Sequence, residues 1–323
     1  MIVRWGLPSL PELLDELSIG RPLLVTTRRW SGLDLGIARR FDSVQPHAEL
    51  QGVDAAAAAA HDADGLVALG GGSAIDTAKA VSVRTALRVV SVPTTYSGAE
   101  WTGHYGTRDA ATLSKPGGGG ALVIGIVYDT NLTLDLPQAE TGGTALNALA
   151  HCVEALYTRA RSEPTDNDAL IGANLISTFL PVVSKTPRSI PARRGLLEAA
   201  MHAGMALRAG MGVGHAMAQA LGGRYGLSHG TMNALCLPHA LEFNLDVAPR
   251  AIRYLGAAMD TTNLVERVAE LARLGGPTRL RDYGVPREDL TLVAAAAAER
   301  PAALANPRPA SAEAIAALLN AAW

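Results

Sequence analysis

Cysteine is scarce in this chain, and neither sign of charge dominates it. Two cysteines, Cys152 and Cys236, occur among 323 residues, and both lie in apolar sequence of helical type. Such a pair favours buried, reduced thiols in a cytoplasmic protein over a disulfide framework. The formal net charge at pH 7 is −2, so the composition implies no binding to nucleic acid or to an anionic membrane.

Long apolar runs and targeting signals are also missing. No apolar stretch reaches about 18 uninterrupted residues, so we expect no membrane span. The opening MIVRWGLPSLPELL has no basic segment followed by an apolar run, so we expect no signal peptide. Hydrophobic residues make up 48% of the chain and charged residues 18%, which predicts a large core rather than disorder. The length suits two domains of roughly 100–200 residues each.

Short β-rich runs alternate with helical segments in the N-terminal part of the chain. The runs predict strands at residues 23–27, 65–72, 88–95 and 122–129. Helical segments are expected at residues 31–41 and 55–61. Strands that alternate with helices predict a parallel sheet covered on both faces, and continuously apolar strands agree with that burial. We therefore expect an α/β nucleotide-binding domain over residues 1–134.

Beyond about residue 135 the pattern changes to long helices with almost no strand signal. Apolar residues recur at helical spacing over residues 144–158, 166–180, 193–209, 215–221, 231–243, 264–274, 290–298 and 311–323. We expect an all-helical domain over residues 135–323.

A glycine-rich turn joins a predicted strand to a predicted helix in GLVALGGGSAIDTAKAV. Gly70, Gly71 and Gly72 would let the backbone approach a ligand closely, and Ser73 is placed as the residue that caps the helix. Free N–H groups at a helix start favour an anion such as a pyrophosphate. The turn follows neither the GxGxxG nor the P-loop pattern, so a tight turn without a ligand is the alternative.

Hydroxyl side chains follow the next predicted strand, in VPTTYSGAE. Ligands of open α/β sheets bind at the carboxyl ends of the strands. Thr94, Thr95 and Ser97 are therefore candidate donors to the same ligand, and an ordinary polar turn is the alternative.

One predicted helix, residues 144–158, is apolar almost all the way round. It still carries a polar stripe at helical spacing, formed by Asn147, His151, Glu154 and Thr158. A mostly apolar helix is normally buried, so the stripe is expected to face a cavity or a polar partner.

Six blocks occur in an order that resembles a known family: GGGSAIDTAKA, VPTTYSGAE, VYDTNLTLDLP, NALAHCVEALY, GHAMAQALGGRYGLSHG and NPRP. They resemble the iron-containing alcohol dehydrogenase superfamily, and within it the maleylacetate reductases. The resemblance implies the dehydroquinate synthase-like, or group III alcohol dehydrogenase, architecture. That architecture has a nucleotide-binding α/β domain, a helical domain, and an active site in the cleft between them.

The resemblance implies a nicotinamide cofactor and suggests its contacts. The matching positions are Gly70, Gly71, Gly72, Ser73, Asp76, Thr94 and Thr95, to which we add Ser97 and Thr27. Thr27 ends the first predicted strand, where similar metal-dependent members often carry Asp. Arg28 and Arg29 follow it, and an arginine near this strand end can accommodate a ribose 2′-phosphate. NADPH should therefore be accepted at least as well as NADH.

The same resemblance assigns the active site to the helical domain. In metal-dependent members one helix supplies Asp and His four residues apart, and later helices supply two more His. The matching residues are Asn147, His151, His215 and His229, which we expect to be catalytic. Because an amide replaces the carboxylate, we expect no metal. If a metal is present, His151, His215 and His229 would be its ligands, since three imidazoles can bind zinc.

The resemblance predicts an NAD(P)H-dependent reductase that converts maleylacetate, a conjugated keto acid, to 3-oxoadipate in the catabolism of aromatic compounds. A homodimer is the family-like expectation. Lys115, Tyr105 and Arg308 are candidate partners of the substrate. His229 follows Ser228 at a helix start, where the dipole disfavours a cationic imidazole.

Other functions stay open at this point. They are a metal-dependent alcohol dehydrogenase, a lyase or cyclase like dehydroquinate synthase, and a non-catalytic nucleotide-binding protein. Two residues depart from the reductase branch. Gln219 stands where many members carry another His, and Trp101 replaces a smaller apolar residue. A homologue retuned to another substrate, in a biosynthetic pathway, is therefore a further alternative.

Overall fold

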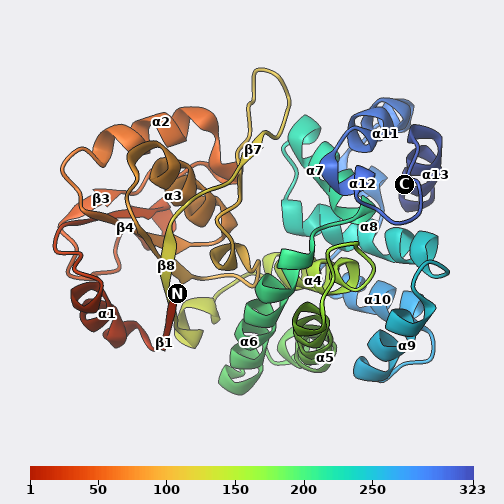
Figure 1. Ribbon diagram of the computed structural model, residues 1–323, viewed down its shortest axis with the longest axis horizontal. Helices are drawn as coiled ribbons and strands as arrows, with labels where there is room; N and C mark the ends of the chain where they lie inside the picture. Colours follow the sequence, from red (N-terminus) through yellow and green to blue (C-terminus); the bar gives the residue numbers. More distant parts are fainter. The chain divides into compact units, whose positions relative to one another are not determined.

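The N-terminal part of the chain is built on a six-stranded parallel β-sheet (Figure 1). The computed structural model describes residues 1–323, which fall into two units. The first comprises Met1–Thr95 and Ala99–Thr133, and the second comprises Tyr96–Gly98 and Leu134–Trp323. The short segment Tyr96–Gly98 thus belongs with the second unit although it follows a strand of the first.

The sheet has the strand order β1-β8-β5-β4-β2-β3. Its strands are β1 (Ile2–Trp5), β2 (Pro22–Thr26), β3 (Arg39–Phe41), β4 (Gly65–Gly70), β5 (Val89–Pro93) and β8 (Val123–Tyr128). All neighbouring strands pair in parallel. The four strands predicted from the sequence are present, and the expected parallel sheet is confirmed. The edge strands β1 and β3 were not predicted, because such short runs carry little periodic signal.

Side chains of each central strand point alternately into two apolar cores. Leu66 and Ala68 of β4 contribute to one core, whereas Val67 and Leu69 contribute to the other. Helices α2 (Leu50–Ala59) and α3 (Gly72–Thr85) supply residues to the first core, and α1 (Leu10–Glu16) supplies residues to the second. The sheet is therefore covered on both faces, which explains why its strands are apolar throughout.

The prediction of a helix at residues 31–41 is wrong. This segment runs through turns into β3, and only a short 3₁₀ turn, Arg28–Trp30, precedes it. A small two-stranded antiparallel hairpin, β6 (Tyr105–Gly106) with β7 (Gly117–Gly118), lies between β5 and β8 in the sequence.

The second unit is helical, as expected. Its helices are α4 (Gln138–Ala155), α5 (Glu163–Lys185), α6 (Ile190–Ala206), α7 (Val213–Tyr225), α8 (His229–Asn244), α9 (Pro249–Ala258), α10 (Leu264–Arg273), α11 (Leu290–Ala298), α12 (Pro301–Leu304) and α13 (Ala312–Ala322). Helices α9 and α12 were not predicted. None of the helices combines the length and the apolar character that crossing a membrane requires.

Helix α4 lies at the centre of this unit and packs against α5, α6 and α8. From Thr141 to Ala155 every residue except Thr144 is buried, which confirms the burial predicted for this helix. The helix starts at Gln138, six residues before the predicted start at Thr144, since Gly142 and Gly143 conceal the periodicity at its beginning.

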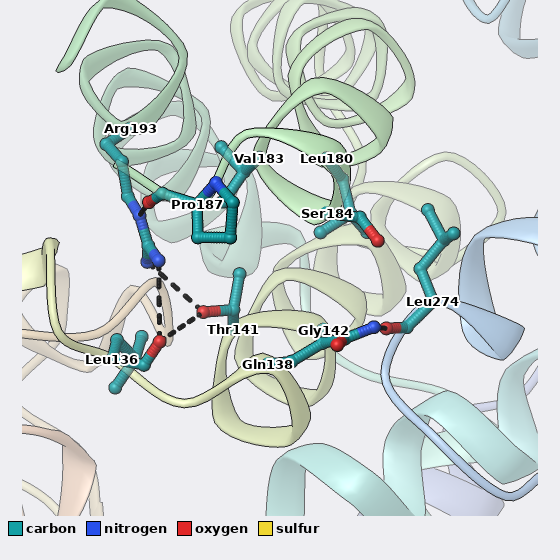
Figure 2. A pocket seen from close by; sticks show the side chains of 10 residues that line it. All are labelled: Leu136, Gln138, Thr141, Gly142, Leu180, Val183, Ser184, Pro187, Arg193 and Leu274. Carbon is teal, nitrogen blue, oxygen red and sulfur yellow. Dashed lines mark hydrogen bonds between the residues drawn. The ribbon is translucent and has the colours of Figure 1, made fainter. Parts of the chain in front are cut away.

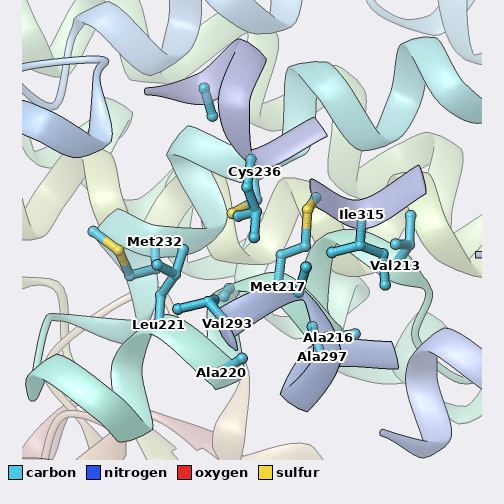
Figure 3. Packing of buried hydrophobic residues seen from close by; sticks show 14 of the residues in the cluster. Val213, Ala216, Met217, Ala220, Leu221, Met232, Cys236, Val293, Ala297 and Ile315 are labelled. Carbon is cyan, nitrogen blue, oxygen red and sulfur yellow. The ribbon is translucent and has the colours of Figure 1, made fainter. Parts of the chain in front are cut away.

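A second apolar cluster joins α7 and α8 to α11 and α13 (Figure 3). Met217 of α7, Cys236 of α8, Val293 of α11 and Ile315 of α13 meet there. Cys236 and Cys152 are both free and buried, as predicted, and burial raises the pKa of each thiol. Neither thiol is therefore a reactive thiolate.

Candidate active site

The glycine-rich turn of the first unit lies between β4 and α3. Gly70 has a φ of +149°, and a Cβ atom there would lie 2.8 Å from the Cβ of Ala74. A Cβ on Gly71 would lie 2.8 Å from Cγ2 of Thr95. A side chain at either position would force Ala74 or Thr95 to shift, and the turn ends at the start of α3, where backbone N–H groups favour an anionic ligand.

The start of α3 differs from the sequence prediction. The helix begins at Gly72 and its N-terminal cap residue is Gly71, so the prediction that Ser73 caps the helix is wrong. The cap residue therefore lies two residues before the predicted one. The Ser73 Oγ instead accepts a hydrogen bond from the backbone N–H of His47 at 2.9 Å.

Thr94 and Thr95 lie beside this turn because β4 and β5 are in register, with Gly70 opposite Pro93. The backbone N–H of Thr94 donates to the carbonyl of Gly70 at 3.0 Å. Thr95 Oγ1 is buried and has no hydrogen-bond partner in the protein. A buried hydroxyl without a partner is costly, so this atom fits a contact with a bound phosphate or ribose. Thr27 directly follows β2, the neighbour of β4.

Asp76 has partners within the protein. Its carboxylate accepts hydrogen bonds from Lys79 Nζ and from the backbone N–H of Gly106, each at 3.2 Å. Lys79 is almost fully buried and also donates to the carbonyl of His104 at 2.7 Å. Asp76 thus fixes the segment that carries Tyr105. Lys115 lies nearby, since its Cε would be 3.3 Å from a Cβ on Gly106.

In the second unit, three helices bring the predicted histidines together. His151 of α4 and His215 of α7 stack with ring centroids 4.7 Å apart and planes 14° from parallel. His229, the first residue of α8, lies with its ring centroid 5.9 Å from that of His215. His151 lies 64 and 78 positions before His215 and His229 in the sequence, and helix packing makes the three residues neighbours.

The close approach of α4 and α8 depends on a pair of glycines. A Cβ on Gly230 would lie 2.7 Å from the carbonyl carbon of Gly143, and a Cβ on Gly143 would lie 3.1 Å from the backbone nitrogen of Thr231. Such distances exclude a larger residue without a shift of one helix. The two glycines therefore set how near His229 comes to the polar stripe of α4.

Glu154 holds His215 in place. Its Oε2 is 2.6 Å from His215 Nδ1, and both side chains are fully buried. The same carboxylate accepts hydrogen bonds from the backbone N–H groups of Gly212 and His215, at 2.6 and 3.3 Å. Glu154 therefore satisfies the start of α7 and fixes Nδ1 as the nitrogen that carries the proton. His215 Nε2 is buried and has no partner within the protein.

A pair of amides occupies the other end of the stripe. Asn147 Nδ2 donates to the carbonyl of Ser97 at 3.1 Å, and Asn147 Oδ1 accepts from Asn233 Nδ2 at 2.7 Å. Asn233 Nδ2 also lies 3.2 Å from His229 Nε2. Ser97, expected as a cofactor contact, is thus placed in the second unit with its carbonyl bound to Asn147.

Burial also sets the charge of His151. The pKa of His151 lies well below its ordinary value, mainly because burial disfavours the charged ring and also because His215 is close. His151 is therefore a neutral imidazole at neutral pH. Thr158, the last residue of the predicted stripe, lies beyond the end of α4, and its hydroxyl donates to the carbonyl of Ala209 at 2.6 Å.

An amide, Asn147, stands at the position that the sequence resemblance matches to a metal-binding carboxylate. Its Oδ1 already accepts a hydrogen bond, so the side chains present do not fit that ligand set. An amide is an uncharged and weaker ligand for a divalent ion. No group of three or more His, Cys, Asp or Glu side chains in the chain is placed where it could hold a metal ion.

Two contributors to the site were not identified from the sequence. The role of Glu154 as the partner of His215 was missed, although Glu154 lies on the predicted stripe of α4. Asn233 was not singled out, and its spacing of four residues from His229 was the available signal.

Two further residues singled out from the sequence are engaged within the protein. Arg308 is exposed, donates to the carbonyl of Phe243 at 2.8 Å, and stacks on that ring. Trp101 Nε1 donates to the hydroxyl of Tyr128 at 2.7 Å.

The chain is similar to known proteins over nearly its whole length. The family described as "Iron-containing alcohol dehydrogenase" matches residues 5–117. The family described as "Fe-containing alcohol dehydrogenase family, C-terminal" matches residues 141–323. A maleylacetate reductase from Pseudomonas aeruginosa is 32% identical over 98% of this chain and 93% of its own length.

Solved structures show the same likeness. The crystal structure of maleylacetate reductase from Agrobacterium tumefaciens has a TM-score of 0.90 at 32% identity, covering 100% of this chain and 95% of that one. Sulfoacetaldehyde reductase from Bifidobacterium kashiwanohense, solved in complex with NAD+, shares the fold with a TM-score of 0.89 at 21% identity, covering 100% and 96% of the two chains. The chain therefore belongs to the iron-containing alcohol dehydrogenase family, is an oxidoreductase, and within that family resembles the maleylacetate reductases.

Proposed function

We propose that this protein is an NAD(P)H-dependent reductase of a conjugated keto acid, with maleylacetate as the first candidate, and that it works without a metal. The observation that carries this proposal is the amide pair of Asn147 and Asn233 beside the three histidines. This pair gives the cluster hydrogen-bonding groups in place of a metal-binding carboxylate. The 32% identity to a maleylacetate reductase over 98% of the chain supports the substrate class.

The first unit would hold the cofactor. The turn at Gly70 and Gly71 exposes N–H groups at the start of α3, and Thr95 Oγ1 supplies an unpaired hydroxyl beside it. These groups fit a pyrophosphate and its ribose. In this proposal the domain of residues 1–134 binds the cofactor, and the domain of residues 135–323 carries the catalytic groups. Bound NAD(P)H supplies the hydride that adds to the carbon beta to the ketone.

The histidines of the second unit would handle charge and the proton. As hydride adds to the conjugated double bond, negative charge moves onto the ketone oxygen, and a preorganised hydrogen-bond donor stabilises it. His215 is positioned to pass on a proton through Nε2, because Nδ1 is held by Glu154 and Nε2 is the ring nitrogen left without a partner in the protein. The product is the saturated keto acid, 3-oxoadipate for maleylacetate. The reaction consumes one NAD(P)H and one proton.

A conjugated ketone makes a metal dispensable in this scheme. The double bond is already activated by the carbonyl, whereas an isolated carbonyl depends more heavily on a Lewis acid. The alternative from the same fold, a metal-dependent alcohol dehydrogenase, would use His151, His215 and His229 as ligands. A lyase or a non-catalytic nucleotide-binding protein would show no net consumption of NAD(P)H.

One experiment separates these functions. NADPH oxidation is measured against a panel of conjugated keto acids and simple aldehydes, before and after exhaustive chelation. We expect turnover of the keto acids to survive chelation, and elemental analysis to find no stoichiometric metal. Asn147→Asp should raise affinity for zinc, because it adds an anionic ligand beside the imidazoles. Turnover that is lost on chelation and restored by zinc or iron contradicts the proposal.

We also propose a homodimer, which the family resemblance implies, in a reducing cytoplasm, which suits the two free buried thiols. Sedimentation of the purified protein measures its mass, and a monomer at assay concentration would contradict the first part.

A further inference from the structure

Arg300 is a partly buried cation that lacks an anion. It lies between α11 and α12, and its Nε is buried without a hydrogen-bond partner. Its guanidinium donates one hydrogen bond, from Nη1 to Oε1 of Gln219 at 3.2 Å, and forms no ion pair. Burial lowers the pKa of Arg300, and no neighbouring carboxylate offsets that effect. A buried positive charge without a partner is costly unless a ligand completes it.

Another buried arginine of the same unit shows how a structural guanidinium is satisfied. Arg193 is 1% exposed and lines a cavity of about 60 Å³ (Figure 2). Its nitrogens donate to four oxygens, namely Pro187 O, Tyr96 Oη, Thr141 Oγ1 and Leu136 O. Each of the three guanidinium nitrogens of Arg193 thus has a partner, whereas Nε of Arg300 has none within the protein.

Gln219, which accepts the hydrogen bond from Arg300, lies on α7, the helix that carries His215. Gln219 follows His215 by four residues on α7, so the two side chains lie on one face, with Cβ atoms about 5–6 Å apart. Most other residues of α7 from Val213 to Leu221 belong to the apolar cluster of Figure 3. Gln219 is the only one of this stretch that is partly exposed, so its end of the face is open to solvent.

We propose that Arg300, oriented by Gln219, binds a carboxylate of the keto-acid substrate next to His215. This inference rests on the proposed function. A guanidinium presents a fork of N–H groups that matches a carboxylate, and Nε and Nη are the pair used in such contacts. Gln219 explains why the fork stays available. Its carbonyl oxygen orients the guanidinium without neutralising it, which a carboxylate at the same position would do.

The test uses Arg300→Ala, Arg300→Lys and Gln219→Glu. The last variant places a carboxylate beside Arg300, so it should occupy the guanidinium while leaving the fold intact. The matched control is Arg281→Ala, an exposed arginine stacked on Trp323. We expect Arg300→Ala and Gln219→Glu to raise KM for maleylacetate about 10- to 100-fold, the scale of hydrogen bonds to a charged group. KM for NADPH should stay as in the wild type, the urea midpoint of Gln219→Glu should not fall below that of the wild type, and Arg300→Lys should recover part of the affinity.

A binding measurement separates this inference from the proposed function. Calorimetric titration of the NADP+-loaded protein with maleate, a dicarboxylate without a ketone, reports carboxylate binding without turnover. We expect binding by the wild type and by Arg281→Ala, and its loss in Arg300→Ala and Gln219→Glu. Maleate binding without any keto-acid reduction would count against the proposed function and leave Arg300 as the carboxylate site. Equal binding by the wild type and both variants, or no binding by the wild type, overturns the inference.

Discussion

The carboxylate of Glu154 lies 2.6 Å from Nδ1 of His215, and both side chains are fully buried. This contact joins the central helix α4 to the start of α7. It also decides which ring nitrogen of His215 remains available for chemistry. Because Nδ1 is committed to Glu154, His215 can act only through Nε2.

Glu154→Gln should lower kcat/KM by at least about 10²-fold, since the amide would place an N–H group against other donors and would no longer fix the tautomer and orientation of the His215 ring. It should also lower the free energy of unfolding, because one of the two oxygens that accept from the backbone N–H groups of Gly212 and His215 is replaced by a donor. Steady-state kinetics and urea unfolding measure the two effects. Glu270→Gln, on an exposed position of α10, is the control. A rate within about threefold of the wild type would contradict the role of Glu154.

The three histidines are expected to act as one unit. His151→Ala, His215→Ala and His229→Ala should each lower kcat/KM by at least about 10²-fold, the usual size of general-acid and oxyanion contacts. The losses in kcat/KM should not be additive in the double variants, because residues that act in the same catalytic step depend on one another. His61→Ala is the control, since the His61 side chain is 87% exposed. Normal rates in all three single variants would show that these histidines are structural core residues without a catalytic role.

Gly71→Ala should weaken cofactor binding. The added Cβ would lie 2.8 Å from Thr95 Cγ2 and would push apart the two segments that we assign to the cofactor. Overpacking of this kind costs about 1–3 kcal/mol, so KM for NADPH should rise about tenfold or more. Gly32→Ala, where nothing lies within 4 Å of the new atom, is the matched control. An unchanged KM in both variants would remove the turn from the cofactor site.

NADPH should serve at least as well as NADH. Thr27 follows β2 without a carboxylate, and the next residues, Arg28 and Arg29, are exposed and cationic. A ribose 2′-phosphate can pair with a guanidinium at this position. The measurement is KM for both cofactors in the wild type, Arg28→Ala and Arg29→Ala. A strong preference for NADH that neither substitution changes would show that the two arginines are ordinary surface residues.

Glu100 should make stability fall as pH rises. Its side chain is buried and accepts a hydrogen bond from the Tyr128 hydroxyl at 2.6 Å, while Oε2 has no partner. Burial raises the pKa of Glu100 above the ordinary value of 4.5, against smaller opposing effects of Tyr128 and Lys79. Folding therefore favours the protonated acid. The stability this provides is complete below the ordinary pKa and is lost as pH rises through the raised value, by at most about 1.4 kcal/mol per pH unit.

Urea unfolding of the wild type and Glu100→Gln between about pH 5 and about pH 8 measures this effect. The amide variant should gain stability relative to the wild type as pH rises. Glu12→Gln, at an exposed position of α1, should follow the wild type. Parallel curves for the wild type and Glu100→Gln would mean that Glu100 does not change its protonation on folding.

Several features of this protein could be predicted from the sequence because their signals are local. The runs 65–72 and 88–95 are apolar and end in glycine or threonine, so they indicated buried strands with a ligand-binding edge. The apolar helix around His151 could only be buried, and its polar stripe indicated a functional site. Composition and periodicity are properties of residues close together in the sequence, so they can be read without knowledge of the fold.

The pairing of side chains was decided by the tertiary structure. Glu154 and His215 are 61 residues apart, Asn147 and Asn233 are 86 apart, and Gln219 and Arg300 are 81 apart. No local pattern specifies which residue of one helix meets which residue of another. That choice follows from close packing, such as the contact of Gly143 with Gly230 that brings α8 against α4. The sequence by itself determined that a polar site had to be buried among these helices, and the packing of the helices determined which groups in it are paired and which are left for a ligand.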